Sequence, residues 1–168
     1  YIFERRLFQL SCMGQLTDHG KCLLEHFPYE ALIKNWEARN ARFYVAYSNS
    51  KELPHYATDV ATPLLKVMIE RMDAALKEGC TTAADLSFGH DVTLMPLIAH
   101  IGIKGMHENF SFDEANANWG AADFICMGSN IQFIFYQNRK GEVLVKILYN
   151  EKETSIPALE ASDGPFYR

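Results

Sequence analysis

The most constraining feature of this sequence is a strand-to-helix unit near its middle. Ala84 to Phe88 is a short, largely apolar stretch that ends at Gly89, which predicts a strand and the turn that closes it. Val92 to Ile101 then predicts a short buried helix that ends at Gly102. A strand followed directly by a helix is a building block of α/β folds, so we expect a mixed α/β chain.

Two polar residues, His90 and Asp91, lie where this strand meets this helix. Ligands of open α/β sheets bind at the carboxyl ends of strands, and the amino ends of helices favour anions. This pair of residues suits phosphoryl chemistry. The imidazole can contact phosphate oxygens, and the carboxylic acid can protonate a leaving alkoxide. The alternative is structural: Asp91 caps the helix, worth about 1 kcal/mol, and His90 bonds a neighbouring carbonyl. Spacing alone leaves both interpretations open.

No second chemical motif accompanies this pair. The sequence has no Gly-x-Ser-x-Gly, no P-loop and no Gly-x-Gly-x-x-Gly. The other histidines have no partner at ligand spacing and are expected to be non-catalytic: His19, His26, His55, His100 and His107. The cysteines form no C-x-x-C pair and are expected to be buried or free thiols, although one disulfide stays open: Cys12, Cys22, Cys80 and Cys126. We therefore expect no metal and no cofactor.

Composition narrows the class of protein. A chain of 168 residues with 48% hydrophobic residues can bury a real core. Its net charge of −5, without a cluster of Lys and Arg, argues against nucleic acid as the main partner. No apolar run approaches the roughly 18 to 20 residues that a membrane-spanning helix needs.

The flanking segments predict helices first and strands last. Tyr1–Cys12 and Leu23–Tyr47 carry apolar residues at helical spacing. Thr62 as a cap and Pro63 in the first turn predict the start of a further helix, which Gly79 ends.

Strands are expected after residue 122. Phe124–Met127 is a short strand candidate, while Ile131–Tyr136 and Val143–Tyr149 are strong strands joined by a hairpin at Asn138–Gly141. Two segments are expected to be irregular: Lys104–Asn118 and the tail Glu151–Arg168.

The central unit also resembles a known family. Ala84-Asp85-Leu86-Ser87-Phe88-Gly89-His90-Asp91, followed by Leu94–Leu97 and Ile101–Ile103, resembles the proton-donor segment of the histidine phosphatase superfamily. The similarity is to the acid phosphatase and phytase branch, including the bacterial multiple inositol polyphosphate phosphatases. Phe27–Tyr44, with Trp36 and Asn40 inside it, resembles the helical cap of such proteins. Met127–Gln132 and Val143–Glu151 resemble their carboxyl-terminal hairpin.

The resemblance implies a fold and a mechanism. Residues 57–168 would form the carboxyl-terminal part of a three-layer α/β/α core, and residues 1–56 a helical cap-like region. The activity implied is hydrolysis of phosphomonoesters, inositol phosphates among them, through a phosphohistidine. His90 would be the second histidine of the phosphate pocket, catalytic and substrate-binding. Asp91 would be the general acid for the leaving alcohol and then the base that activates water. The resemblance also implies a periplasmic or secreted parent protein.

One element of the family pattern is missing. The nucleophile of the family lies in an Arg-His-Gly-x-Arg-x-Pro motif, and this sequence contains no such motif. We therefore expect a carboxyl-terminal portion of a longer phosphatase, inactive alone, whose apolar surface is covered by an amino-terminal half or by another copy of the chain. The alternative hypotheses are a non-catalytic module that binds phosphate or other anions, and a purely structural domain.

Overall fold

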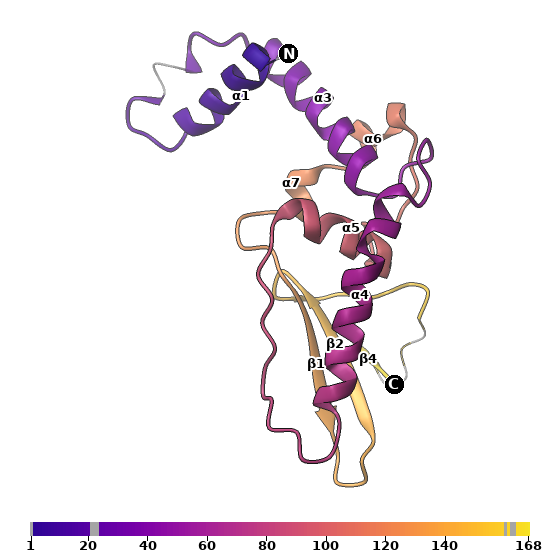
Figure 1. Cartoon of the computed structure of the whole chain (residues 1–168). Coiled ribbons are helices and arrows are strands. Elements are labelled where there is room, and N and C mark those ends of the chain that lie inside the picture. The colour runs from indigo at the N-terminus through magenta and orange to yellow at the C-terminus, as the bar shows by residue number, and fades with distance from the viewer. Residues whose placement is uncertain (1, 21–23, 160, 162–163) are drawn as a thin grey trace.

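The computed structural model describes residues 2–20, 24–159, 161 and 164–168, and it is a mixed α/β structure, as predicted (Figure 1). The helices are α1 (Ile2–Gly14), α3 (Tyr29–Tyr47), α4 (Tyr56–Ala75), α5 (Asp91–Ile101), α6 (Phe112–Asn118) and α7 (Ala121–Phe124). The strands are β1 (Ile131–Gln137), β2 (Val143–Tyr149), β3 (Lys152–Glu153) and β4 (Phe166–Tyr167).

The sheet is antiparallel and centred on β2. The predicted hairpin is confirmed, because β1 pairs with β2 over its full length, from Ile131 opposite Tyr149 to Gln137 opposite Val143. Gly141 closes the turn with a φ of 84°, a conformation that glycine adopts without strain. The tail, expected to be irregular, contributes β3 and β4, which both pair with β2. One edge of β1 therefore has no strand partner within the described residues.

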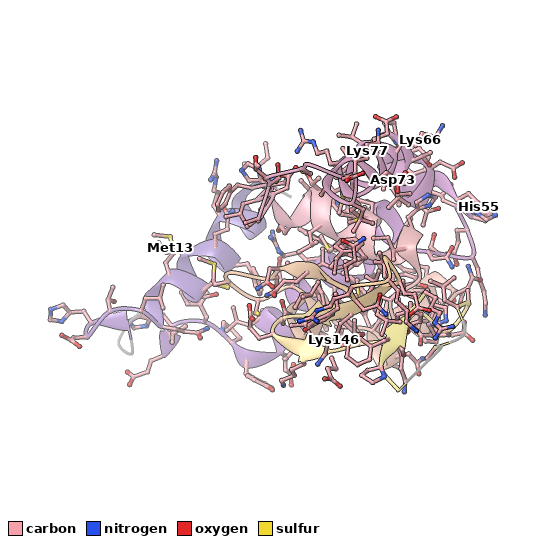
Figure 2. All side chains as sticks on the ribbon, turned by 90° about the horizontal axis from the view of Figure 1, so that it is seen from below. Met13, His55, Lys66, Asp73, Lys77 and Lys146 are labelled. Carbon is pink, nitrogen blue, oxygen red and sulfur yellow. The ribbon has the colours of Figure 1, made fainter. Side chains whose placement is uncertain are left out.

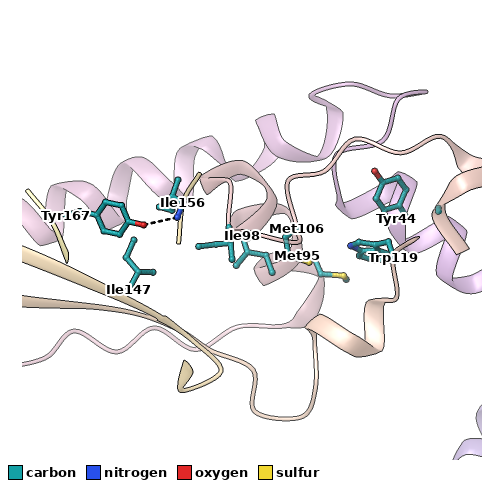
Figure 3. Packing of buried hydrophobic residues seen from close by; sticks show 10 residues of the cluster. Tyr44, Met95, Ile98, Met106, Trp119, Ile147, Ile156 and Tyr167 are labelled. Carbon is teal, nitrogen blue, oxygen red and sulfur yellow. Dashed lines mark hydrogen bonds between the residues drawn. The ribbon is translucent and has the colours of Figure 1, made fainter. Parts of the chain in front are cut away.

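The helices α4 and α5 lie on one face of this sheet. Seen from below, Lys66 and Asp73 of α4 lie on one side of the molecule and Lys146 of β2 lies on the other (Figure 2). The helix α5 packs along α4, and its Met95 and Ile98 belong to the same buried cluster as Ile147 of β2 (Figure 3). Burial of each such side chain contributes about 1.5 to 3 kcal/mol, so α5 is held firmly between α4 and the sheet.

Tyr44 connects α3 to the segment that follows α5. Its side chain is fully buried, and its hydroxyl accepts a hydrogen bond from the backbone N–H of Phe110 at 2.7 Å. The same hydroxyl lies 2.9 Å from the carbonyl oxygen of Asn49 and 3.0 Å from that of Glu108, to which it can donate. One side chain thus satisfies backbone groups from two segments that are far apart in sequence.

Asn40, one helical turn earlier, makes a second connection of this kind. Its Oδ1 accepts from the backbone N–H of Ala121 at 2.8 Å, and its Nδ2 donates to the carbonyl of Trp119 at 2.7 Å. Nδ2 also lies 3.0 Å from Oδ1 of Asn116. Asn40 and Tyr44 belong to the segment that resembles the helical cap. In this chain both residues are buried, and they connect α3 to later segments.

Helix α4 starts earlier than predicted. It begins at Tyr56, so Thr62 is not its cap and Pro63 lies in its second turn rather than its first. The reason is tertiary: Ala57 and Ala61 are buried, and this burial extends the helix upstream of the local start signals.

Two further predictions were wrong. Phe124–Met127 forms no strand: Phe124 ends α7, and its ring stacks on Trp119 with centroids 6.1 Å apart. The expected loop 104–118 contains α6, which begins with a capping box in which Ser111 and Glu114 satisfy each other's backbone N–H groups. The Ser-x-x-Glu pattern of that box was present in the sequence.

Candidate active site

His90 and Asp91 lie at the start of a helix, as predicted. His90 is the N-cap residue, with extended φ and ψ of −121° and 163°, and α5 begins at Asp91. The carbonyl of His90 accepts from the N–H groups of both Thr93 and Leu94, each at 3.0 Å, which makes a tight first turn. Pro96, buried in the second turn, cannot donate a backbone hydrogen bond there.

The carboxyl end of α5 is fixed more strongly than its amino end. Gly102 adopts a left-handed φ of 84°, and the N–H groups of Gly102 and Ile103 both bond the carbonyl of Ile98, at 3.2 and 3.0 Å. Because the residues from Met95 to Ala99 are buried, the helix is anchored from its second turn onward. His90 and Asp91 project from an anchored helix into solvent.

The side chain of Asp91 interacts with its own helix. Its Oδ1 accepts from the backbone N–H of Val92 at 2.8 Å, and a carboxylate in the first turn is favoured by the helix dipole. Asp91 is nevertheless not the N-cap, which corrects the structural alternative. The His90 ring makes no capping hydrogen bond to α5. Both side chains are exposed, so the fold leaves them accessible to a ligand.

The segment before the junction differs from the prediction. Ala84–Phe88 is not a strand, because no other strand within the described residues pairs with it. It runs exposed from α4 to α5, with Leu86 75% and Phe88 94% exposed (Figure 1). A strand is stabilised by its neighbours, so an apolar strand sequence without them stays unpaired.

One side-chain contact joins this segment to α4. The carboxylate of Asp85 lies 3.3 Å from the guanidinium of Arg71 on α4, and both side chains are about half exposed.

The other candidate metal ligands within the described residues do not form a metal site. Among the described residues, no group of three or more His, Cys, Asp or Glu side chains could hold a metal ion. His100 lies 3.4 Å from the hydroxyl of Thr62, and His107 lies 3.3 Å from the carbonyl of Ile103. The thiols of Cys12, Cys80 and Cys126 are free and exposed, while Cys22 lies outside the described residues. Within the described part of the chain, no helix is long and apolar enough to cross a bilayer.

Comparison with known proteins places this junction in a family. A family model described as histidine phosphatase superfamily (branch 2) matches residues 10–150, a range that includes His90 and Asp91. The chain belongs to the histidine phosphatase superfamily. The resemblance inferred from the motif around His90 is thereby confirmed.

Solved structures agree on the fold. The chain is similar to the Bifidobacterium longum multiple inositol polyphosphate phosphatase in complex with phosphate, with a TM-score of 0.73 and 23% identity. It is also similar to the apo form of that phosphatase, with a TM-score of 0.72 and 22% identity. Each alignment covers 90% of this chain and 34% of the Bifidobacterium chain, so this chain spans about a third of that protein. No curated protein matches the chain.

Proposed function

We propose that this chain is the proton-donor part of a phosphomonoester hydrolase that acts through a phosphohistidine. One observation carries the proposal: His90 and Asp91 stand exposed at the amino end of an anchored helix, inside the region matched by the histidine phosphatase family. The helix end adds a partial positive charge where a phosphate would bind.

The two side chains take complementary roles in this proposal. The imidazole of His90 donates a hydrogen bond to a phosphate oxygen. In the first step a histidine nitrogen bonds the phosphorus, the bond from phosphorus to the ester oxygen breaks, and Asp91 gives its proton to the leaving alkoxide. In the second step the Asp91 carboxylate takes a proton from water. The water oxygen then bonds the phosphorus, and the phosphorus–nitrogen bond breaks.

The nucleophile comes from outside these residues. The 168-residue sequence lacks the Arg-His-Gly-x-Arg-x-Pro motif of the family, and no other ionisable side chain hydrogen-bonds His90 or Asp91 within the described part of the chain. The chain alone should therefore release no phosphate from phosphomonoesters. The parent protein, which supplies the nucleophile, should be active.

Inositol polyphosphates are the substrate class that we favour. Solved structures similar to this chain include a multiple inositol polyphosphate phosphatase from Bifidobacterium longum. A substrate of this class carries several phosphate groups, and the exposed His90 and the amino end of α5 suit one of them. We further propose, on family resemblance alone, that the parent protein is periplasmic or secreted.

The test is a pair of isosteric substitutions in the parent protein. Asp91→Asn removes the transferable proton and should lower kcat for an alkyl phosphomonoester about 100- to 10,000-fold, the range for a general acid. Asp73→Asn is the matched control, since Asp73 is an exposed carboxylate on α4 and lies outside the segment that carries His90 and Asp91. It should leave kcat within about twofold of wild type, because surface substitutions away from a site have small effects. Equal losses in the two variants would contradict the assignment.

A second function is favoured by the same exposure of His90. Without a nucleophile, an imidazole at a helix amino end can simply bind phosphate or another anion. One measurement on the parent protein distinguishes the two functions. Binding of inositol hexakisphosphate without phosphate release would identify the binding module, and release that depends on Asp91 would identify the hydrolase.

A further inference from the structure

The chain reaches His90 through a segment that has little support of its own. Residues 81–89 link α4 to α5, are exposed along their whole length and belong to no helix or strand (Figure 1). Exposed backbone with few contacts is the part of a fold that moves most easily. The position of His90 relative to a ligand therefore depends on whatever holds this segment.

Arg71 of α4 holds it at one residue. Its Nη1 lies 3.3 Å from Oδ1 and 3.5 Å from Oδ2 of Asp85, which lies shortly before His90 in the sequence. Within the described residues, residues 81–89 make only one other hydrogen bond, a local one from the backbone of Thr82 to the sulfur of Cys80. The contact between Arg71 and Asp85 is thus the polar connection between this segment and the rest of the described chain.

Helix α4 also contacts the chain on the other side of the His90–Asp91 pair. The helix α5 packs along α4, and Nε2 of His100 near the end of α5 lies 3.4 Å from the hydroxyl of Thr62. Thr62 and Arg71 both belong to α4, which is continuous from Tyr56 to Ala75, so the spacing between them is set by helix geometry. One helix therefore supports the chain before and after the site.

We propose that Arg71 is a positioning residue for His90 and Asp91 and acts on them through Asp85. This inference rests on the proposed function of His90 and Asp91. Arg71 forms no hydrogen bond or ion pair with either of them in the described chain. Its role is to restrict the backbone that enters α5, so that the imidazole and the carboxyl group keep the geometry that proton transfer needs.

The exposure of the ion pair sets the size of the effect. The side chains of Arg71 and Asp85 are 55% and 46% exposed, and a pair this exposed shifts a two-state equilibrium by at most about fivefold. Losing the pair should lower the population of correctly positioned segment about three- to fivefold. kcat should fall by the same factor, whereas KM should stay unchanged because Arg71 does not bind the substrate.

Steady-state kinetics of the parent protein on an alkyl phosphomonoester provide the first test. Arg71→Gln should lower kcat about three- to fivefold and leave KM within about 1.5-fold of wild type. Lys66→Gln is the matched control, since it removes an exposed cation from the same helix, and its kcat should stay within about 1.5-fold. Exchange of the two charges, Arg71→Asp with Asp85→Arg, should recover the kcat that each single substitution loses.

Backbone order parameters from NMR relaxation provide a second test that does not depend on activity. In the 168-residue chain, residues 86–89 should have order parameters above about 0.6 in the wild type and below that value in Arg71→Gln. The charge-exchanged variant should regain the wild-type values, and the urea midpoint should be the same in all three proteins. A purely structural role of the pair would instead move the urea midpoint and leave the order parameters unchanged.

Four results would overturn the inference: unchanged kcat in Arg71→Gln, an equal loss in Lys66→Gln, no recovery on charge exchange, or unchanged order parameters. The proposed function fails by a different result, a parent protein whose phosphate release is absent or does not depend on Asp91. In that case the order parameters still decide whether Arg71 positions the segment that leads to His90 and Asp91.

Discussion

Replacing Tyr44 by Phe measures the contribution of the hydroxyl group that joins α3 to residues 106–110. The side chain is fully buried, so Phe keeps the ring and its edge contact with Trp119, whose centroid lies 5.1 Å away. The substitution leaves the N–H of Phe110 without its bond at 2.7 Å. Of the two carbonyls, that of Asn49 still accepts from Asn109 at 2.9 Å. The main cost is therefore one unsatisfied buried donor.

An unsatisfied buried donor costs about 1 to 3 kcal/mol, and we expect a loss of about 2 kcal/mol for Tyr44→Phe. For a chain of this size that corresponds to a fall in Tm of about 4 to 8 °C. The assay is urea unfolding of the 168-residue chain, followed by circular dichroism. Tyr29→Phe is the matched control, because Tyr29 is 76% exposed, and it should change stability by less than about 0.5 kcal/mol. A loss below that limit for Tyr44→Phe would refute the connector role of the hydroxyl.

Three further predictions concern other parts of the chain. The Lys51 ammonium and Ser111 lower the pKa of Glu114 from 4.5 to about 2. The ionised Glu114 carboxylate therefore stabilises the fold fully above pH 4.5, and this stabilisation is lost as the pH falls toward 2. The difference in urea midpoint between wild type and Glu114→Gln should vanish over that pH range. Burial raises the pKa of Tyr149 from 10 to about 12, so stability should fall as the pH rises from 10 to 12, and Tyr149→Phe should remove that part of the fall. Phe88→Ser should leave the unfolding midpoint of the isolated chain unchanged because Phe88 is 94% exposed, whereas Ile98→Ala, at a fully buried position, should cost about 2 to 5 kcal/mol.

Local signals in the sequence predicted the elements that depend on local interactions. The hairpin of β1 and β2 is specified by two apolar runs and a turn with Gly141, and it formed from the two predicted strands. Helix α5 is specified by a continuous apolar run and by Gly102, and its end was predicted correctly. For the same reason the junction at His90 and Asp91 could be located from the sequence.

Apart from α6, whose local capping signal was missed, predictions failed where contacts distant in sequence decide the outcome. Residues 84–88 have the composition of a strand, but pairing requires neighbours that the described chain does not supply. The start of α4 was set by burial of Ala57 and Ala61 rather than by Thr62 and Pro63. Asn40 and Tyr44 are buried because they hydrogen-bond backbone groups more than 60 residues away, and no local sequence pattern predicts these contacts.

The central claim is that Asp91 donates the proton to the leaving group, and the dependence of rate on the leaving group tests it most directly. The parent protein and its Asp91→Asn variant are compared on an alkyl phosphate and on 4-nitrophenyl phosphate, whose leaving group departs without protonation. In a single-turnover assay the variant should lose about 100-fold or more in the release of the alkyl alcohol, and less than about tenfold in the release of nitrophenol. Equal losses on the two substrates, or no loss on either, would contradict Asp91 as the proton donor.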